Sequence, residues 1–203
     1  MKVQRTRTRL SPDKRREQLL ETAKTLILER GLQSFTMEAV ARTAEVSSPL
    51  VYNYFSSRQA LLEQLLVREY EMFALDMEAA LSQAKNFQEV VKISVTGNFD
   101  HHAPGNILPI LLSQPEIASA LSTVRKKHAK RNARFLVKSA AEAYNLTIEE
   151  SQLLVSMSSG ASIAAADWAT TGGGANNRDK AITTAVQYIL AGLEATVNQG
   201  KKR

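Results

Sequence analysis

Apolar residues recur every three or four positions along most of the chain, and this spacing is typical of amphipathic helices. The first such stripe consists of Leu19, Leu20, Ala23, Leu26 and Ile27. Ser11, Pro12 and Asp13 precede it and suit a helix start, since the hydroxyl can cap free N–H groups and proline fits the first turn. Gly31 is expected to end the helix.

The same reasoning predicts two short helices, one capped by Thr36 and one capped by Ser47 or Ser48, and then a long fourth helix from about Ser57 to about Ala84. Five further helices are expected at residues 87–100, 107–113, 116–144, 148–169 and 178–198. Alternating strand patterns and Asn-Gly or Asp-Gly hairpin turns are nearly absent. The sequence therefore predicts an all-α protein of nine helices, in which a functional boundary falls inside the fourth.

Charge is concentrated at one end of the chain. Seven basic residues and one acid lie within residues 1–16, whereas the net charge of all 203 residues is +6, so the remainder is neutral. A local excess of this kind is typical of an electrostatic arm that contacts a polyanion. A solvated tail without a partner is the alternative.

Residues 36–55 have the spacing of a helix-turn-helix. Two short helices flank the turn at 44–47, and the small side chain of Ala41 would let them cross closely. A helix of about seven residues is stable only when it packs on a scaffold. Its outward face, from Ser47 to Asn53, would then be free to enter a DNA major groove.

Between Leu19 and Leu66 the segments LLETAKTLILERG, FTMEAVARTAEVS, LVYNYF and SSRQALLEQL resemble the TetR family of one-component transcriptional regulators in order and spacing. The resemblance implies a nine-helix TetR-like fold with a basic arm at 1–10, a DNA-binding domain at 11–57 and a helical effector-binding and dimerisation domain at 58–203. The chain departs from the family pattern at Glu45, where glycine is usual. It also departs at Asn53 and Tyr54, which replace an aromatic–histidine pair, and at Leu50, which replaces a more polar residue.

The resemblance also implies which side chains contact DNA. Thr36 and Tyr52 would bind the phosphate backbone, and Arg58 stands where the family has a lysine near phosphate. The candidates for groove contact are Ser47, Ser48, Pro49, Leu50 and Asn53. Asn53 is suited to adenine and Leu50 to a thymine methyl. A capping role alone stays open for Ser47.

Four arginines complete the expected DNA contacts. Arg5, Arg7 and Arg9 would follow the minor groove or the backbone from an extension before the first helix. Arg42 on the second helix is a candidate phosphate ligand, although an exposed arginine there requires no function.

The later helices are expected to enclose a small-molecule effector. On the helix predicted at 116–144, His128 and Asn132 interrupt an apolar row, as the few orienting groups of an apolar cavity do. The candidate ligand contacts are Asn98, Phe99, His101, Leu121, Val124, His128, Asn132, Phe135 and Trp168. A buried histidine with an internal partner is the alternative for His128.

Small residues are frequent in the last two predicted helices, and they suit a self-complementary homodimer interface, with an intramolecular core as the alternative. Two reading helices related by a two-fold axis imply a near-palindromic operator, bound by one dimer or by two. The leading hypothesis is a repressor that a small-molecule effector releases from double-stranded DNA. The alternatives are an activator and an adaptor of the same fold that binds a protein.

Several other classes of protein are not expected. The chain has no cysteine and three histidines, two of them adjacent in a segment that makes a weak metal site, and it has no phosphate-binding loop. We therefore expect no enzymatic activity, no cofactor and no metal. No apolar run is long enough to cross a membrane, and the N-terminus lacks the apolar run of a secretory signal, so a cytoplasmic location is expected.

Overall fold

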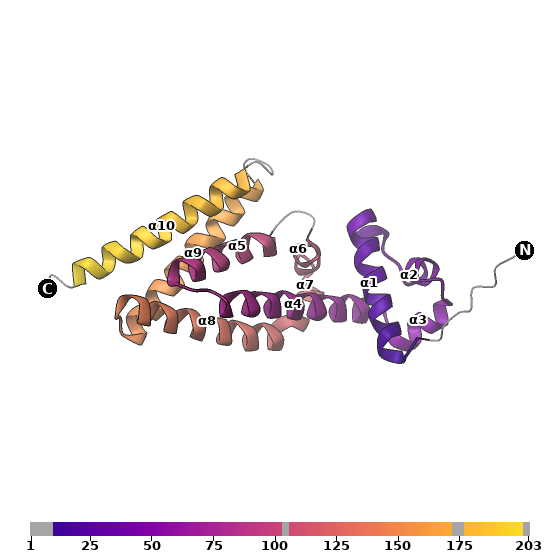
Figure 1. Ribbon diagram of the computed structural model, residues 1–203. Coiled ribbons are helices and arrows are strands. Elements are labelled where there is room, and N and C mark those ends of the chain that lie inside the picture. Colours follow the sequence, from indigo (N-terminus) through magenta and orange to yellow (C-terminus); the bar gives the residue numbers. More distant parts are fainter. Residues whose placement is uncertain (1–9, 103–105, 172–176, 201–203) are drawn as a thin grey trace, which may run out of the picture. The chain divides into compact units, whose positions relative to one another are not determined.

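The computed structural model describes residues 10–102, 106–171 and 177–200, and all regular elements within these ranges are helical (Figure 1). The all-α fold predicted from the sequence is confirmed, and each predicted helix has a counterpart. The α-helices are α1 (Pro12–Arg30), α2 (Met37–Thr43), α3 (Ser48–Tyr54), α4 (Arg58–Ser82), α5 (Phe87–His102), α6 (Ile107–Leu112), α7 (Pro115–Ala118), α8 (Ser122–Tyr144), α9 (Ile148–Thr171) and α10 (Arg178–Gly200). Two 3₁₀ turns, η1 (Leu32–Ser34) and η2 (Ser119–Leu121), join some of them.

The chain forms two compact units, residues 1–66 and 67–203. The division between them falls inside α4, where the sequence places a functional boundary. The domain boundary suggested by the family resemblance lies earlier, between residues 57 and 58, so the first turns of α4 belong to the first compact unit.

Helix α1 begins and ends where its sequence predicts. The Ser11 side chain accepts a hydrogen bond from the backbone N–H of Lys14 at 3.4 Å, and Pro12 occupies the first turn. Gly31 ends the helix with φ of 77°, a conformation that costs glycine little, and its N–H donates to the carbonyl of Ile27. The predicted apolar stripe is the buried face of α1.

In the first unit, helix α2 packs against α1 and against α3 (Figure 1). Met37, Ala39 and Val40 bury one face of α2. Ala41, 2% exposed, lies where the chain turns toward α3, and its carbonyl accepts a hydrogen bond of 2.9 Å from the N–H of Val46. A larger side chain at Ala41 would have to displace this turn, because no space is left around it.

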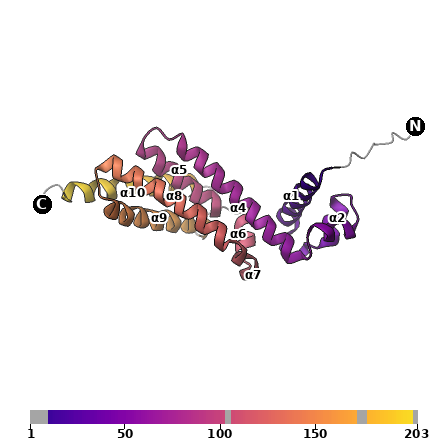
Figure 2. The same cartoon turned by 90° about the horizontal axis from the view of Figure 1, so that it is seen from below.

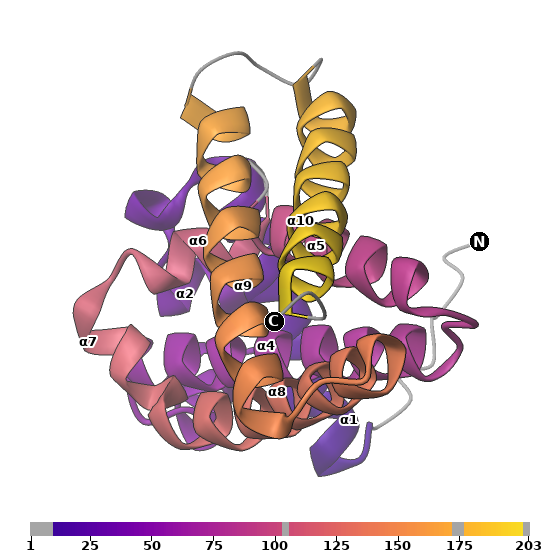
Figure 3. The same cartoon turned by 90° about the vertical axis from the view of Figure 1, so that its left-hand side faces the viewer.

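The second unit is built around α5, α9 and α10. Helices α9 and α10 lie side by side (Figure 3), and α8 packs against α9 (Figure 2). Their shared core consists of Val91, Val95, Phe99, Ala166, Ala169, Ala181, Ile182, Ala185, Ile189 and Leu193. The alanines of α9 and α10 allow this close approach, so part of the small-residue surface belongs to the core of the unit itself.

The helix predicted at 116–144 is divided in the structure. Pro115 opens the short helix α7, the 3₁₀ turn η2 follows, and α8 begins only at Ser122. Ile117 and Leu121, at 5% and 1% exposure, both face inward across this irregular stretch. Periodicity did not reveal the division, because the apolar spacing of three and four is compatible with both types of helix.

Candidate nucleic-acid interface and ligand pocket

Helix α3 separates a buried face from an exposed one. Val51 and Phe55 are 0% and 1% exposed, whereas Tyr52 is 45% exposed and Asn53 is also on the surface. Seven residues cannot hold a helix alone, so these two buried side chains fix α3 and leave Tyr52 and Asn53 available to a partner.

The start of each short helix is capped differently. The Thr36 hydroxyl accepts a hydrogen bond of 3.1 Å from the N–H of Ala39. Ser47 is the N-cap residue of α3, but its side chain makes no capping hydrogen bond. Ser47 and Pro49 are exposed, while Ser48 and Leu50 are half-buried. Capping alone therefore does not account for the serine at 47.

One side chain of α2 contacts the exposed face of α3. The Tyr52 hydroxyl donates to a carboxylate oxygen of Glu38 at 3.4 Å, a long hydrogen bond that is weak by its geometry. The surface formed by the N-terminus of α2 and the outward side of α3 therefore carries hydroxyl, amide and carboxylate groups. Arg42 is exposed in the last turn of α2.

Arg58 connects the start of α4 to the segment before α2. Its Nε donates to the carbonyl of Phe35 at 3.0 Å, and its Nη2 donates to the carbonyl of Leu32 at 2.9 Å. The guanidinium also lies 5.5 Å from the centre of the Phe35 ring. Arg58 thus holds the entry to α2 in place, a role that sequence reasoning did not assign to it.

Arg16 is a second structural arginine that sequence reasoning missed. Its Nη1 donates to Gln64 at 2.6 Å and to the carbonyl of Tyr54 at 3.5 Å, and its guanidinium lies 5.3 Å from the ring centre of Phe55. It therefore joins α1, α3 and the start of α4. Its position one helical turn before Leu19, on the buried stripe, is the signal that could have revealed this role.

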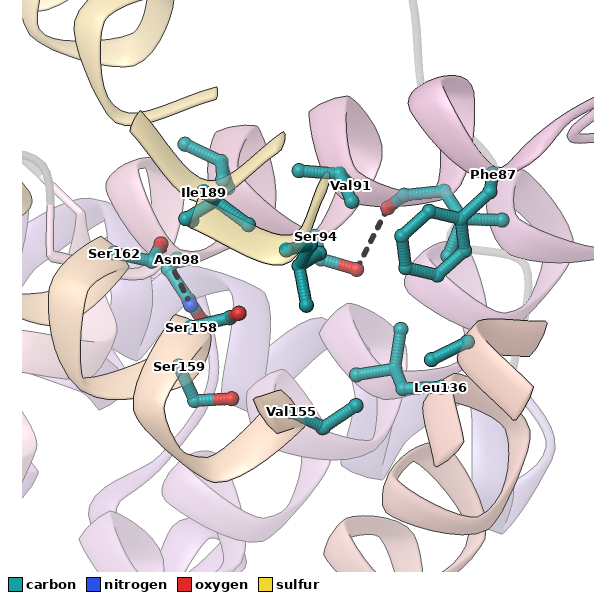
Figure 4. A pocket seen from close by; sticks show the side chains of 14 residues that line it. Phe87, Val91, Ser94, Asn98, Leu136, Val155, Ser158, Ser159, Ser162 and Ile189 are labelled. Carbon is teal, nitrogen blue, oxygen red and sulfur yellow. Dashed lines mark hydrogen bonds between the residues drawn. The ribbon is translucent and has the colours of Figure 1, made fainter. Parts of the chain in front are cut away.

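The second unit contains a pocket between α5, α8, α9 and α10 (Figure 4). Its lining residues are Phe87, Val90, Val91, Ser94, Val95, Asn98, Leu136, Ala140, Val155, Ser158, Ser159, Ser162, Ile189 and Leu193. The empty volume is about 450 Å³, part of it open to solvent. Such a cleft, mostly apolar with a few polar groups, is typical of small-molecule sites.

The predicted ligand contacts do not all lie at this pocket. Asn98 lines it, as predicted, and its amide donates to the Ser162 hydroxyl at 3.0 Å. The remaining predicted positions are distributed around the second unit: Phe99 and Leu121 are buried, Val124 and Asn132 are half-buried, Phe135 and Trp168 are 39% and 52% exposed, and His101 is in the last turn of α5. Trp168 lies on the outer surface of α9, so its emission would not report directly on this pocket.

His128 lies on a different face of α8 from the pocket. It is 6% exposed and contacts the ring of Tyr70 edge to face, with ring centres 6.3 Å apart. Its Nδ1 is 3.5 Å from Arg131, which forms an ion pair with Glu78. Helix α8 instead presents Leu136 and Ala140 to the pocket, so the alternative of a buried histidine with internal contacts describes His128 better.

Residues 19–65 match the family model described as bacterial regulatory proteins of the tetR family. The HTH-type transcriptional regulator LuxR of Vibrio harveyi is 40% identical over 77 residues, which cover 36% of this chain and 38% of LuxR. The chain therefore spans less than half the length of that curated relative.

The whole fold is also found among solved structures. A TetR-like transcriptional regulator from Rhodococcus sp. RHA1 matches with a TM-score of 0.61 and 22% identity, over 92% of this chain and 99% of that one. Residues 19–65 therefore belong to the TetR family, and the chain as a whole has the fold of a TetR-like regulator. RolR in complex with resorcinol matches with a TM-score of 0.57 and 20% identity, over 88% of this chain and 87% of that one, and shares the fold. These relatives are named as regulators and not as enzymes.

Family membership explains one unusual backbone conformation. The TetR-family pattern has glycine where this chain has Glu45, and Glu45 adopts φ of 55°. The left-handed conformation is costly for a residue with a Cβ atom. The turn of the helix-turn-helix is thus kept in this TetR-family domain despite the substitution.

We expect Glu45→Gly to raise the free energy of unfolding of the first unit by about 0.5–1 kcal/mol, because relief of the strain exceeds the extra entropy of an unfolded glycine. Urea denaturation followed by circular dichroism measures the change. Asn145→Gly is the matched control, because Asn145 also has positive φ, at 53°, and asparagine tolerates it. Equal effects of the two substitutions would contradict the explanation.

Large apolar side chains are exposed on the last two helices, α9 and α10. The exposed fractions of Leu153, Met157 and Tyr188 are 63%, 64% and 70%. A groove between α9 and α10 adjoins them and is lined by Met157, Tyr188 and Gly192 among others. An unpartnered apolar surface of this kind is typical of an interaction site.

Three predictions concern residues outside the described ranges or features expected to be absent. Arg5, Arg7 and Arg9 lie outside the residues that the structure describes. Within the described ranges, no cluster of three or more histidine, cysteine, aspartate or glutamate side chains is arranged to hold a metal ion. No helix in those ranges combines the length and the apolar character needed to span a bilayer.

Proposed function

We propose that this protein is a ligand-responsive transcriptional repressor that binds DNA through α3. The observation that carries the proposal is the division of α3 into a buried face, Val51 and Phe55, and an exposed face, Tyr52 and Asn53. A seven-residue helix fixed to a scaffold with its polar face outward has the form of a recognition helix. As a DNA-binding regulator, it would act in the cytoplasm.

The exposed groups divide into positioning and base-reading contacts. The N-terminus of α2 at Thr36 and the hydroxyl of Tyr52 suit phosphate oxygens, and the weak contact between Tyr52 and Glu38 can be exchanged for one to DNA. The amide of Asn53 matches the donor and acceptor pattern of adenine in the major groove. Arg42, exposed in the last turn of α2, is a further candidate phosphate ligand.

We assign the apolar surface of α9 and α10 to a homodimer. Leu153, Met157 and Tyr188 would be covered by the same residues of a second copy, as a two-fold interface requires. Gly160 and Gly192 support this assignment, because each has open space where a Cβ atom would stand. Two copies of α3 would then contact successive major-groove faces about 34 Å apart, on a near-palindromic operator.

We assign the pocket between α5, α8, α9 and α10 to the effector. Because α4 contributes residues to both compact units, a change in the second unit can reach the first through one continuous helix. An effector that binds more tightly to the conformation unsuited to the operator spacing would release the dimer from DNA. RolR, which shares the fold, was solved with resorcinol bound. This supports a small-molecule effector for the present protein.

Selection of genomic fragments by the full-length protein tests the proposal. We expect recovery of near-palindromic DNA, whose affinity decreases steeply with salt because phosphate contacts release counterions. Removal of residues 1–9 should flatten the slope of log K against log salt by up to about 2.7, since each of Arg5, Arg7 and Arg9 would contribute about 0.9.

Removal of residues 201–203 is the control for the arm, because Lys201, Lys202 and Arg203 carry three positive charges, one fewer than the four basic side chains of residues 1–9. We expect it to leave the slope unchanged. Equal slopes for the two truncated proteins would contradict the role of the arm. Failure to recover any DNA would contradict the proposed function and favour an adaptor that binds a protein.

A further inference from the structure

The two ends of the pocket in the second unit differ in polarity. Figure 4 shows the side chains of Asn98, Ser158, Ser159 and Ser162 gathered at one end, with Phe87, Val91 and Leu136 toward the other. Helix α5 runs along the pocket, and the eleven steps from Phe87 to Asn98 span about 16 Å at 1.5 Å per residue. The pocket therefore suits an elongated molecule with chemically different ends.

The polar end can both accept and donate hydrogen bonds. The Ser158 hydroxyl donates its proton to the carbonyl of Leu154 at 2.8 Å, which leaves its oxygen lone pairs as acceptors. The Ser162 oxygen accepts a hydrogen bond from Asn98, so its own proton remains to be donated. A ligand group that donates and accepts at once, such as a hydroxyl or a primary amide, matches this pair.

The pocket offers no charge to pair with an ion. Its described lining residues are apolar, serine or asparagine, with no lysine, arginine, histidine, aspartate or glutamate among them. An unpaired ion transferred from water into such surroundings loses its hydration without compensation. The pocket therefore excludes effectors whose bound group is ionised, because that group would find no opposite charge in the lining.

The apolar end is bordered by a pair of aromatic rings. Phe87 contacts the ring of Tyr144 edge to face, with ring centres 5.4 Å apart. Burial raises the pKa of the Tyr144 hydroxyl, and the carboxylate of Glu194 raises it further, so the hydroxyl stays protonated at neutral pH.

The free space limits the size of the ligand. The part of the pocket that is wide enough for a water molecule has a volume of about 50 Å³. This is several times the roughly 10–15 Å³ that one water requires. A short aliphatic chain or one small ring fits this space, and a larger molecule would require the helices to separate.

We propose that the pocket selects a small uncharged amphiphile, with its hydroxyl or amide at Ser158, Ser159 and Ser162 and its apolar part toward Phe87 and Leu136. The inference rests on the proposed function only in treating this pocket as the effector site. It adds the chemical class of the ligand, and it excludes carboxylate and ammonium compounds of the same size.

Three six-carbon probes of different charge test the class: hexan-1-ol, hexanoate and hexylammonium, each titrated at pH 7 into the full-length protein and followed by ligand-observed NMR. We expect hexan-1-ol to bind at least about 10-fold more tightly than either ion, a difference of about 1.4 kcal/mol. Equal or tighter binding of an ion, or no binding of any probe by folded protein, would overturn the proposal.

A substitution at the polar end should invert the preference. Ser159→Lys places a cation among the serines, so hexanoate is then expected to bind more tightly than hexan-1-ol. The matched control is Ser156→Lys on the same helix, because Ser156 is exposed and does not line the pocket, and it should keep the preference of the unchanged protein. Inversion by both substitutions, or by neither, contradicts the assignment of the polar end.

A milder substitution covers the case in which Ser159→Lys does not fold. Ser159→Ala removes one hydroxyl, and we expect it to weaken hexan-1-ol by about 3- to 10-fold, the usual range for one hydrogen bond, while hexanoate stays weak. An unchanged affinity for hexan-1-ol contradicts a hydroxyl contact at this serine.

Release of operator DNA is measured separately from binding. If hexan-1-ol binds with the expected preference but does not release DNA, the ligand class stands and the effector role in the proposed function fails. If an ion binds best and releases DNA, the effector role stands and the ligand class fails.

Discussion

Phe55→Ala is expected to lower the free energy of unfolding of the first unit by about 3–5 kcal/mol, the range found for truncation of a buried aromatic side chain. Phe55 is 1% exposed and closes α3, and its ring lies under the guanidinium of Arg16. Its loss removes one of the two side chains that fix α3. Because a seven-residue helix does not persist alone, DNA binding should be lost as well.

Two spectroscopic signals distinguish the unfolding of the first unit from that of the second in this experiment. The only tryptophan, Trp168, lies in the second unit, so its fluorescence reports unfolding there, whereas circular dichroism reports both units. We expect Phe55→Ala to shift an early dichroism transition in urea and to leave the Trp168 transition in place. Tyr54→Ala is the control, since Tyr54 is only half-buried and its truncation should cost less. Equal shifts for the two variants would contradict the role assigned to Phe55.

Asn53→Asp is expected to weaken operator binding by about 100-fold without lowering the melting temperature. The replacement keeps the shape of the side chain but removes the amide donor, which is worth about 1–3 kcal/mol at a bidentate contact, and adds a charge that the DNA phosphates repel. Asn53 is exposed on α3, so the fold should tolerate the change. Fluorescence anisotropy of a labelled operator fragment measures the affinity.

The control is Asn198→Asp, which makes the same chemical change at an exposed position of α10. We expect it to leave operator affinity within about a factor of two, because one distant charge is largely screened beyond 10 Å at 0.1 M salt. If Asn53→Asp binds as tightly as Asn198→Asp, α3 is not the helix that contacts DNA. A lower melting temperature for Asn53→Asp would instead indicate a structural role for the amide.

The first unit could be predicted closely because its signals are local. Ser11 and Thr36 cap helices whose buried stripes recur at steps of three and four, and each contact lies within a few residues of its signal. The positive φ expected at Glu45 from the family pattern is also present. Helix α3, by contrast, was predicted from what surrounds it, since it is too short for a periodic signal of its own.

The two structural arginines show where local signals are insufficient. Arg16 was counted with the basic arm and Arg58 with the phosphate ligands, because an arginine near a DNA-binding motif suits either role. In the structure Arg16 contacts Gln64, and Arg58 contacts the carbonyls of Leu32 and Phe35. These partners are more than twenty positions away in the chain, so composition and periodicity cannot identify them.

Of the residues that the sequence predicts as effector contacts, Asn98 lines the pocket and most of the others do not. The polar row at His128 and Asn132 was the natural choice, since polar groups on an apolar helix stripe often orient a ligand. On helix α8, His128 packs against Tyr70, whereas Leu136 and Ala140 line the pocket. The polar groups of the pocket are Ser94 and Asn98 of α5 and three serines of α9, which the sequence suggested for close helix packing.

The sequence by itself determined the helices, the caps, the helix-turn-helix and the family, because each depends on residues that are neighbours along the chain. The rotation of α8 about its axis, the partners of Arg16 and Arg58, and the meeting of Asn98 with Ser162 were decided only by the tertiary structure. A helical period shows which side chains share a face, but the element that covers that face depends on contacts between distant segments.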